Sequence, residues 1–382
     1  HPSKIATIQA TFCAGSRVEY KTKYPHGIAH FSEHMRFKGS EKYTAKELAR
    51  QIAYWGGEWN AFTSEDMVSY YLTIPEENIE KGFQLLSEVV LRPIFPEDEI
   101  EKEKIVVAQE IKMYEDSIQQ SVHRHLFSGV FNNSLARNII GTEDSIKNIT
   151  EQDLINFNKE FYFNNYILAV GSKNNYANFV EKYFETPGQF ISKAGLIDSF
   201  YSDNFIDRFH KEGFKQHSTV VAFGSDEIHN LQQIGSYEVF NYIFGGGADS
   251  RLFEKIREDL GLVYGIHSNT NHKLDGSLFY VGFQTEPNNV DLVLKAIDEE
   301  INKMSQETPT TEELERAKNN LKSQYYHSLD SSVGVISEII DEQIYGGKND
   351  LETLEEINNT TSEQVLEIAK KVFSSNKYTV IG

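Results

Sequence analysis

Two patterns of apolar residues run through the first part of the chain, one with a period of two and one with a helical period. Residues 5–14 alternate between apolar and polar positions and predict a β-strand. Residues 60–74 are rich in Thr, Tyr, Phe and Val, and they predict two further strands. Between these segments, residues 44–54 have the spacing of a helix, with Thr44 as the N-cap and Glu47 placed to complete a capping box.

Longer segments with apolar residues at helical spacing follow these strands. Pro93 and Pro96 end the first of them, because proline cannot continue a helix. The pattern predicts helices at 78–91, 97–117, 122–131 and 151–162, and a strand at 166–171.

The chain contains an internal repeat. Residues 150–171 match residues 361–382 without a gap, at a constant offset of 211 positions. Each copy has a Thr-capped helix, a turn that contains Asn and a strand that ends in Gly. Residues 312–323 resemble residues 97–109 in the same way. The repeat indicates two copies of one structural unit.

We therefore predict an α+β fold with two homologous domains, each a mostly antiparallel sheet with helices packed on it. The predicted boundaries are 1–190 for the first domain and 208–382 for the second. Residues 191–207 lie where the periodicity is lost, and they are interpreted as the linker.

Composition narrows the possible functions. The chain has 382 residues, 39% hydrophobic and 25% charged, which is typical of a folded protein with a real core. No apolar run approaches the roughly 18 residues of a membrane span. A net charge of −20 argues against nucleic acid as a partner, because phosphates would be repelled. The single cysteine, Cys13, fits a reducing compartment, so we expect a cytoplasmic protein.

The densest group of candidate ligands is His30-Phe31-Ser32-Glu33-His34. Histidines at i and i+4 share one face of a helix and suit a tetrahedral zinc ion, which needs a third protein ligand. Glu33 is adjacent and could act as a general base. This is the inverted order of the His-Glu-x-x-His motif. A surface helix that carries these residues by chance has the same spacing, so the motif alone leaves both interpretations open.

The sequence resembles the pitrilysin/insulinase superfamily of zinc metallopeptidases, in particular the short two-domain branch of mitochondrial processing peptidase subunits and bacterial relatives. In that family a glutamate ligand follows the second histidine by about 76 residues, a position that Glu110 occupies here. The resemblance implies that His30, His34 and Glu110 hold one Zn²⁺ per chain. A second family glutamate matches Glu103, which lies two helical turns before Glu110 and would orient a ligand or water.

Two further matches concern the substrate. Residues 56–63 resemble the family's edge strand beside the zinc, where a peptide adds as an extra strand. On local grounds this segment is an ordinary strand. The resemblance implies substrate contacts by Asn60, Ala61 and Phe62.

An Arg and a Tyr seven residues apart in the second half also match the family. They are Arg257 and Tyr264, and the resemblance implies that they contact substrate and stabilise the tetrahedral intermediate. Without it, Arg257 is interpreted as a solvated helix residue and Tyr264 as a packed one. The other histidines, His123 and His267 among them, match no ligand position and are expected to be structural or surface residues.

The two halves differ in their candidate chemistry. When the repeats are aligned, Glu110 falls on Gln324 and His34 falls on Asn241. The second half therefore lacks the metal-binding residues. Relatives also begin with a strand about twenty residues before the segment that matches residues 5–14, so we expect a polypeptide trimmed at its N-terminus.

The resemblance implies a zinc-dependent endopeptidase that hydrolyses unfolded peptides or targeting-type segments in an enclosed chamber. Glu33 would take a proton from water and later protonate the leaving amine. We expect a homodimer that closes like a clam shell, with Arg257 and Tyr264 of each subunit acting in trans on its partner. Two alternatives remain: a non-catalytic partner subunit or scaffold of the same family, and a metal-binding module that hydrolyses something other than peptides.

Overall fold

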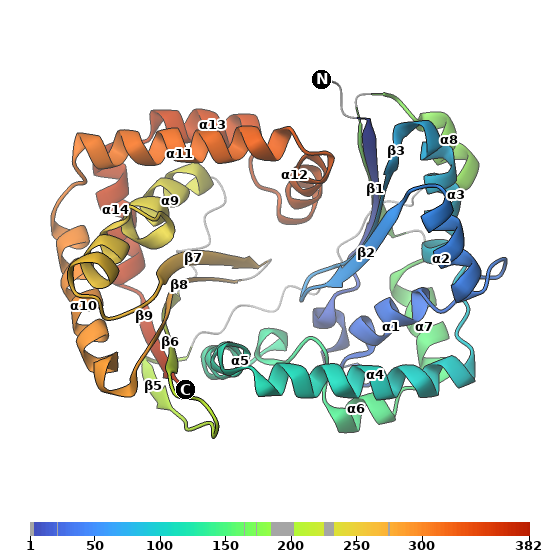
Figure 1. The fold of residues 1–382 in the computed structure, drawn as a ribbon, viewed down its shortest axis with the longest axis horizontal. Helices are drawn as coiled ribbons and strands as arrows, with labels where there is room; N and C mark the ends of the chain where they lie inside the picture. The colour runs from blue at the N-terminus through green and yellow to red at the C-terminus, as the bar shows by residue number, and fades with distance from the viewer. Residues whose placement is uncertain are drawn as a thin grey trace. The chain divides into compact units, whose positions relative to one another are not determined.

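The computed structural model describes residues 4–20, 22–163, 165–172, 174–184, 202–224, 233–273 and 276–382. These residues form two compact units, each made of separate stretches of the chain (Figure 1). The first unit comprises His1–Met113, Arg137–Leu196 and Ser328–Ile344. The second comprises Tyr114–Ala136, Ile197–His327 and Tyr345–Gly382.

A four-stranded antiparallel sheet with the order β2-β3-β1-β4 is the centre of the first unit. Strand β2 lies at its edge and pairs with β3. The strands are β1 (Ile5–Phe12), β2 (Glu58–Thr63), β3 (Val68–Pro75) and β4 (Tyr166–Gly171). The helices are η1 (Ser16–Glu19), α1 (Ile28–Arg36), α2 (Ala45–Tyr54), η2 (Glu76–Asn78), α3 (Ile79–Leu91), α4 (Glu97–Asp116), α6 (Glu143–Lys147), α7 (Glu151–Phe161), α8 (Ala177–Tyr183) and α12 (Ser332–Tyr345).

Helix α3 covers one face of this sheet because its apolar side meets apolar side chains of β1 and β3. Phe83 is fully buried, and Gly82 lets the helix approach closely, since a Cβ there would lie 3.0 Å from Ile8 and 3.2 Å from Ile74. Local sequence determines where neighbouring helices begin. Thr44 and Glu47 form the predicted capping box at the start of α2.

The second unit repeats this topology with one added strand. Its sheet has the order β5-β9-β6-β8-β7, in which β5 pairs parallel with β9 and the other pairs are antiparallel. The strands are β5 (Phe205–Arg208), β6 (His217–Gly224), β7 (Ile266–Lys273), β8 (Gly276–Thr285) and β9 (Asn376–Ile381). The helices are α5 (Ile118–Val130), α9 (Ile234–Asn241), η6 (Tyr242–Gly246), η7 (Phe253–Asp259), η8 (Pro287–Asn289), α10 (Val290–Gln306), α11 (Thr311–Leu329), α13 (Asp350–Asn359) and α14 (Ser362–Phe373); η3 (Ser134–Ala136) follows α5.

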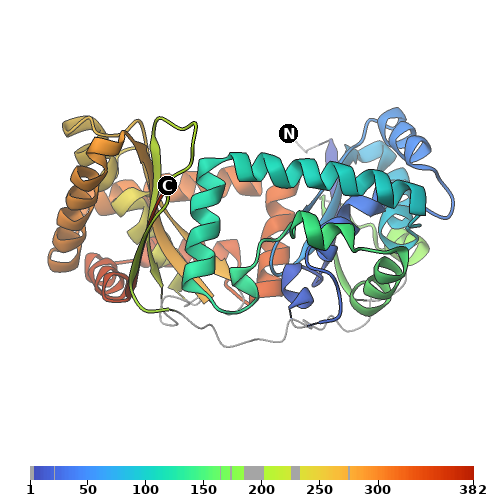
Figure 2. The ribbon, with the colours of Figure 1, turned by 90° about the horizontal axis from the view of Figure 1, so that it is seen from below.

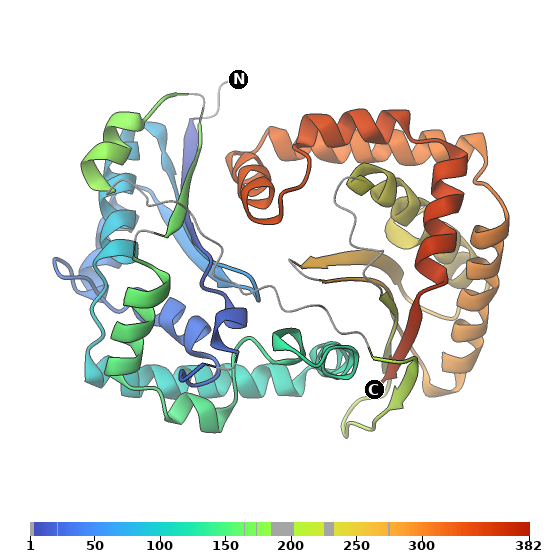
Figure 3. The same ribbon diagram turned by 180° about the vertical axis from the view of Figure 1, so that it is seen from behind.

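Both faces of the second sheet are covered. Helices α10 and α14 lie side by side over one face (Figure 3), where Val221 and Phe223 of β6 enter a large apolar core. The alternate residues Val220 and Ala222 point the other way, into a smaller core that includes Val122 of α5. Figure 2 shows α5 following directly after the long helix α4. Alternate residues of β6 therefore point into two different apolar cores, one on each face of the sheet.

The structure confirms the predicted α+β class and the repeat. Helix α7 and strand β4 correspond to α14 and β9, and both helices begin with a Thr-centred capping box. The compact units differ from the predicted sequence boundaries, because α5 belongs to the second unit and α12 to the first. Residues 205–207 of the predicted linker are part of β5, while residues 191–201 lie outside the described residues. Within the described ranges, no helix is both long and apolar enough to cross a membrane.

Candidate metal centre

Helix α1 presents the histidine motif and is fixed at its first turn. Gly27 precedes the helix with a φ of 91°, a conformation that favours glycine. The carboxylate of Glu19 accepts hydrogen bonds from the backbone N–H groups of Gly27 and Ala29, both at 2.8 Å. These bonds satisfy donors that have no partner within a helix. Because Glu19 is 1% exposed, burial raises its pKa to about 8.

The predicted ligands converge. Nε2 of His30 lies 3.7 Å from Oε1 of Glu110, and Nε2 of His34 lies 3.5 Å from Oε2 of the same carboxylate. The ligand atoms of the three residues lie within 4.8 Å of one another. These separations are longer than hydrogen bonds, but they suit donors around one ion, since bonds of about 2.1 Å at tetrahedral angles separate donors by roughly 3.4 Å. The donor set therefore fits zinc.

Burial keeps the first histidine neutral. His30 is 7% exposed, and its pKa is lowered to about 3, chiefly by burial and then by the proximity of His34. A neutral imidazole offers the lone pair that a metal requires. Burial acts against protonation of His34 too, but the carboxylates of Glu103, Glu33 and Glu110 outweigh it and raise the His34 pKa. Burial raises the pKa of Glu110.

Glu103 contacts the ligand that it was predicted to orient. Its Oε1 lies 2.7 Å from Nδ1 of His34, and its Oε2 forms an ion pair with Lys38. Burial acts to raise the pKa of Glu103, yet the hydrogen bonds with His34 and Lys38 hold it below its ordinary value. Glu103 is therefore a carboxylate that directs Nε2 of His34 toward Glu110. Lys38 was not predicted, since its contact depends on how α1 and α4 pack.

The candidate base has one hydrogen-bond partner among the described residues. The hydroxyl of Thr63 donates to Oε2 of Glu33 at 2.6 Å. Glu33 is 8% exposed, and burial raises its pKa above the ordinary value. Sequence reasoning missed Thr63, although the alternation of β2 places it on the same face as Trp59, which packs against Phe37 at the end of α1.

The predicted peptide-binding residues lie on β2 as expected from the sequence. Asn60, Ala61 and Phe62 pair with β3 through their backbone, and among the described strands β2 has no second neighbour. Phe62 is 42% exposed. A free strand edge can pair with another extended chain, so the geometry allows the predicted addition of a peptide.

Arg257 and Tyr264 contact each other in the second unit. Nε of Arg257 donates to the backbone oxygen of Tyr264 at 2.8 Å, and the guanidinium also pairs with Glu258. The side chain of Tyr264 is 90% exposed, so the interpretation of this residue as a packed aromatic is wrong. Arg257 lies in the π-helical segment η7, a rare geometry that is frequent at functional sites.

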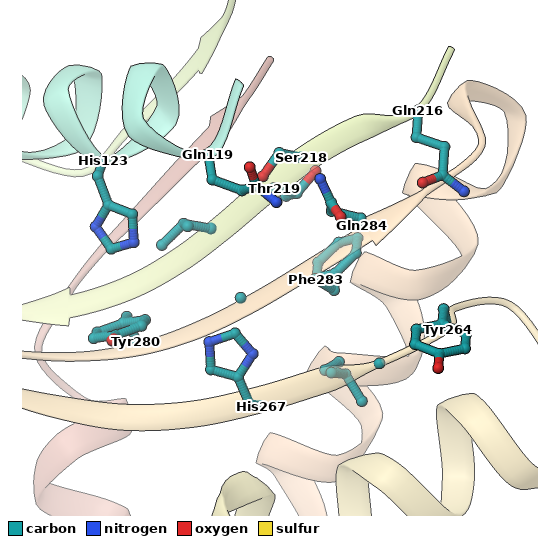
Figure 4. A pocket seen from close by; sticks show the side chains of 14 residues that line it. Gln119, His123, Gln216, Ser218, Thr219, Tyr264, His267, Tyr280, Phe283 and Gln284 are labelled. Atoms are coloured by element: carbon teal, nitrogen blue, oxygen red, sulfur yellow. The ribbon is translucent and has the colours of Figure 1, made fainter. Parts of the chain in front are cut away.

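A pocket of about 710 Å³ lies on the sheet of the second unit beside α5 (Figure 4). Tyr264 is at one end, while His123 and His267 approach Tyr280 edge-on, with ring centroids 5.6 and 6.3 Å away. Burial lowers the pKa of both histidines. The pocket was not predicted, because it forms only when α5 packs on the sheet. Its lining also includes Gln119, Gln216, Ser218, Thr219, Val220, Gly265, Ile266, Gly282, Phe283 and Gln284.

Comparison with known proteins places these features in a wider group. Residues 1–143 match the sequence model described as insulinase (peptidase family M16), and residues 148–321 match that of the peptidase M16 inactive domain. An uncharacterized zinc protease of Rickettsia felis is 30% identical over 370 residues, covering 94% of this chain and 88% of that protein. An uncharacterized zinc protease of Bacillus subtilis is 28% identical over 368 residues, covering 95% and 89%.

Two further similarities extend over most of the chain. The mitochondrial-processing peptidase subunit beta of Caenorhabditis elegans is 27% identical over 386 residues, covering 96% of this chain and 82% of that protein. The crystal structure of a protease from Helicobacter pylori superimposes with a TM-score of 0.91 at 22% identity, covering 100% of this chain and 94% of the other. This last similarity establishes the shared fold.

Proposed function

The chain belongs to the insulinase family of peptidases, family M16, and we propose that it is a zinc-dependent endopeptidase in which Glu33 is the general base. The observation that carries this proposal is the convergence of His30, His34 and Glu110 from two helices, with ligand atoms within 4.8 Å of one another. A surface helix with chance histidines would not meet a carboxylate from a helix some 70 residues away. The names of the zinc-protease relatives support the choice of metal.

A zinc ion held by these residues would act as a Lewis acid on a substrate carbonyl and on water. Glu33 accepts a proton from the attacking water and returns it to the leaving amine. Its pKa is raised by burial, which is the direction that a proton acceptor near neutral pH requires. Glu103 holds the ring of His34 in the orientation that directs Nε2 toward the site.

The proposed substrate class is supported by the edge position of β2, which pairs only with β3 among the described strands. A peptide that pairs with Asn60, Ala61 and Phe62 must be extended, because strand pairing uses its main-chain groups. Unfolded peptides and targeting-type segments meet this condition, whereas folded proteins do not. Pairing through the main chain also tolerates varied side chains.

The proposed assembly is a homodimer with a closed chamber, in which Arg257 and Tyr264 of one subunit serve the zinc site of the other. It is supported by the exposure of Tyr264 and by the absence of the aligned metal ligands from the second half, where Asn241 and Gln324 stand. Because the aligned positions in the second half carry no metal ligands, we propose that Arg257 and Tyr264 serve the zinc site of the partner subunit.

Zinc content and peptide cleavage test this function together. The purified protein should contain one zinc per chain by elemental analysis and should cleave a mixed library of unstructured peptides at internal bonds. A chelator should abolish cleavage, and added zinc should restore it. A protein that binds zinc at these residues but cleaves no peptide would instead be a non-catalytic member of the family.

A further inference from the structure

Thr63 connects two parts of the proposed mechanism. It is the last residue of β2, the strand proposed to pair with the peptide, and its hydroxyl donates to Oε2 of Glu33 at 2.6 Å. A hydrogen bond from a hydroxyl to a carboxylate is short and strong when the carboxylate is ionised. Oε1 of Glu33 has no hydrogen-bond partner among the described residues, so it stays available for proton transfer.

The turn after Thr63 is held against the segment that precedes α1. Backbone N–H groups of Ser16 and Arg17 donate to the carbonyl oxygens of Ser64 and Glu65 at 3.0 and 2.9 Å. The two segments approach so closely at Gly15 that a Cβ there would lie 2.4 Å from the oxygen of Glu65. Only glycine permits this contact, and the end of β2 is therefore fixed in place.

A buried ion pair adds to this attachment. Nε of Arg17 lies 2.7 Å from Oδ1 of Asp66, and the two side chains are 1% and 0% exposed. Loss of either partner would break this buried ion pair, which is destabilising. The pair keeps the β2–β3 turn attached to η1.

The same short helix also holds α1. Glu19, two residues after Arg17, accepts the N–H groups of Gly27 and Ala29 at the start of α1. Helix η1 therefore contacts two elements. Arg17 pairs with Asp66 in the turn after β2, and Glu19 accepts hydrogen bonds from the first turn of α1, the helix that carries Glu33. Because η1 contacts both the turn after β2 and α1, it helps to fix the position of Thr63 relative to Glu33.

We infer that Thr63 is a positioning residue for Glu33, which couples a peptide docked on β2 to the orientation of the base. The inference rests on the proposed function of Glu33. The hydrogen bond from Thr63 restricts rotation of the Glu33 carboxylate and engages Oε2, so that Oε1 remains available to accept the proton. Such a residue affects the chemical step more than peptide binding, since the backbone of β2 makes the contacts to substrate.

The test compares Thr63→Val, which keeps the shape but loses the hydroxyl, with Thr63→Ser, which keeps the hydroxyl. The matched control is Thr73→Val in β3, whose hydroxyl bonds to Thr7 at 2.9 Å in the same sheet. For each full-length variant, kcat and KM on an unstructured peptide, zinc content and melting temperature are measured.

We expect Thr63→Val to lower kcat at least about tenfold, with KM changed less than about twofold and zinc content unchanged. Thr63→Ser should restore kcat to within about threefold of the wild type, and Thr73→Val should not change it. A Thr63→Val protein with wild-type kcat would overturn the inference, as would a Thr63→Ser protein as slow as Thr63→Val. If the unmodified protein cleaves no peptide, the proposed function itself fails and the role of Thr63 falls with it.

Discussion

Nδ1 of His34 lies 2.7 Å from Oε1 of Glu103, and Glu103 shares a face of α4 with Glu110, two helical turns further along. One helix therefore carries both a candidate metal ligand, Glu110, and the carboxylate that contacts a second candidate ligand, His34. The arrangement makes α4 as important to the metal site as α1, although the histidine motif lies entirely on α1.

Removal of the Glu103 carboxylate should weaken zinc binding without abolishing it. We expect Glu103→Gln to lower zinc affinity about 10–100-fold, because the ring of His34 loses its charged partner. Competition with a chromogenic chelator measures the affinity. Glu101→Gln is the control, since Glu101 is 65% exposed on the same helix and pairs with Lys104. Equal affinities for the two variants would show that Glu103 does not orient His34.

Glu110→Gln should have a larger effect on metal and a small one on the fold. The substitution replaces a charged ligand with a weak one, so we expect less than stoichiometric zinc after dialysis. The aligned position in α11 is Gln324, which shows that this helix geometry accepts glutamine. Circular dichroism should match that of the metal-free wild type. Retention of wild-type zinc affinity would remove Glu110 from the site.

Ionisation of the buried Glu19 should lower the free energy of unfolding of the first unit as the pH rises. Its pKa is about 8 in the folded protein against 4.5 ordinarily, so the folded state binds more protons between these values. The free energy of unfolding therefore falls as the pH rises from about 4.5 to 8, by up to about 5 kcal/mol. This free energy is measured by urea unfolding of the metal-free protein at pH 5 and pH 8. Its decrease between the two pH values should be smaller for Glu19→Gln than for the wild type. Parallel decreases in both proteins would exclude this role for Glu19.

The proposed dimer can be tested by complementation. Glu33→Gln and Arg257→Ala should each be inactive, but a mixed dimer regains one complete site if Arg257 acts on its partner. With random exchange, recovered activity should approach about a quarter of wild type. Subunit exchange is verified by mass spectrometry of differently tagged chains. An absence of recovery despite exchange would mean that Arg257 acts within its own subunit.

The sequence predicted correctly those features that depend on residues close together in the chain. The capping box at Thr44 and the helical spacing of His30 and His34 depend on neighbours within one turn, and the structure shows both. Glu110 lies far from the histidines in sequence, so only the family resemblance indicated it. Thr63 was missed because its role depends on how β2 packs against α1.

The boundaries of the compact units also depend on contacts between residues that are far apart in the sequence. Helix α12 lies within the predicted second domain, residues 208–382, but it belongs to the first compact unit, where the hydroxyls of Ser332 and Thr7 lie 2.8 Å apart. The backbone of Ser332 also closes on Gly171, where a Cβ would meet its oxygen at 2.1 Å. Contacts between residues so distant in sequence leave no periodic signal. A repeat therefore locates homologous units better than it locates compact ones.

The most direct test of the central claim is to measure zinc content and peptide hydrolysis of Glu33→Gln beside the wild type. Glu33 lies next to His34 but is hydrogen-bonded to Thr63 rather than grouped with the ligand atoms. We predict wild-type zinc content and a loss of kcat of at least about 100-fold, because proton transfer is lost while the ligands remain. Loss of most of the zinc, or hydrolysis at the wild-type rate, would contradict the account.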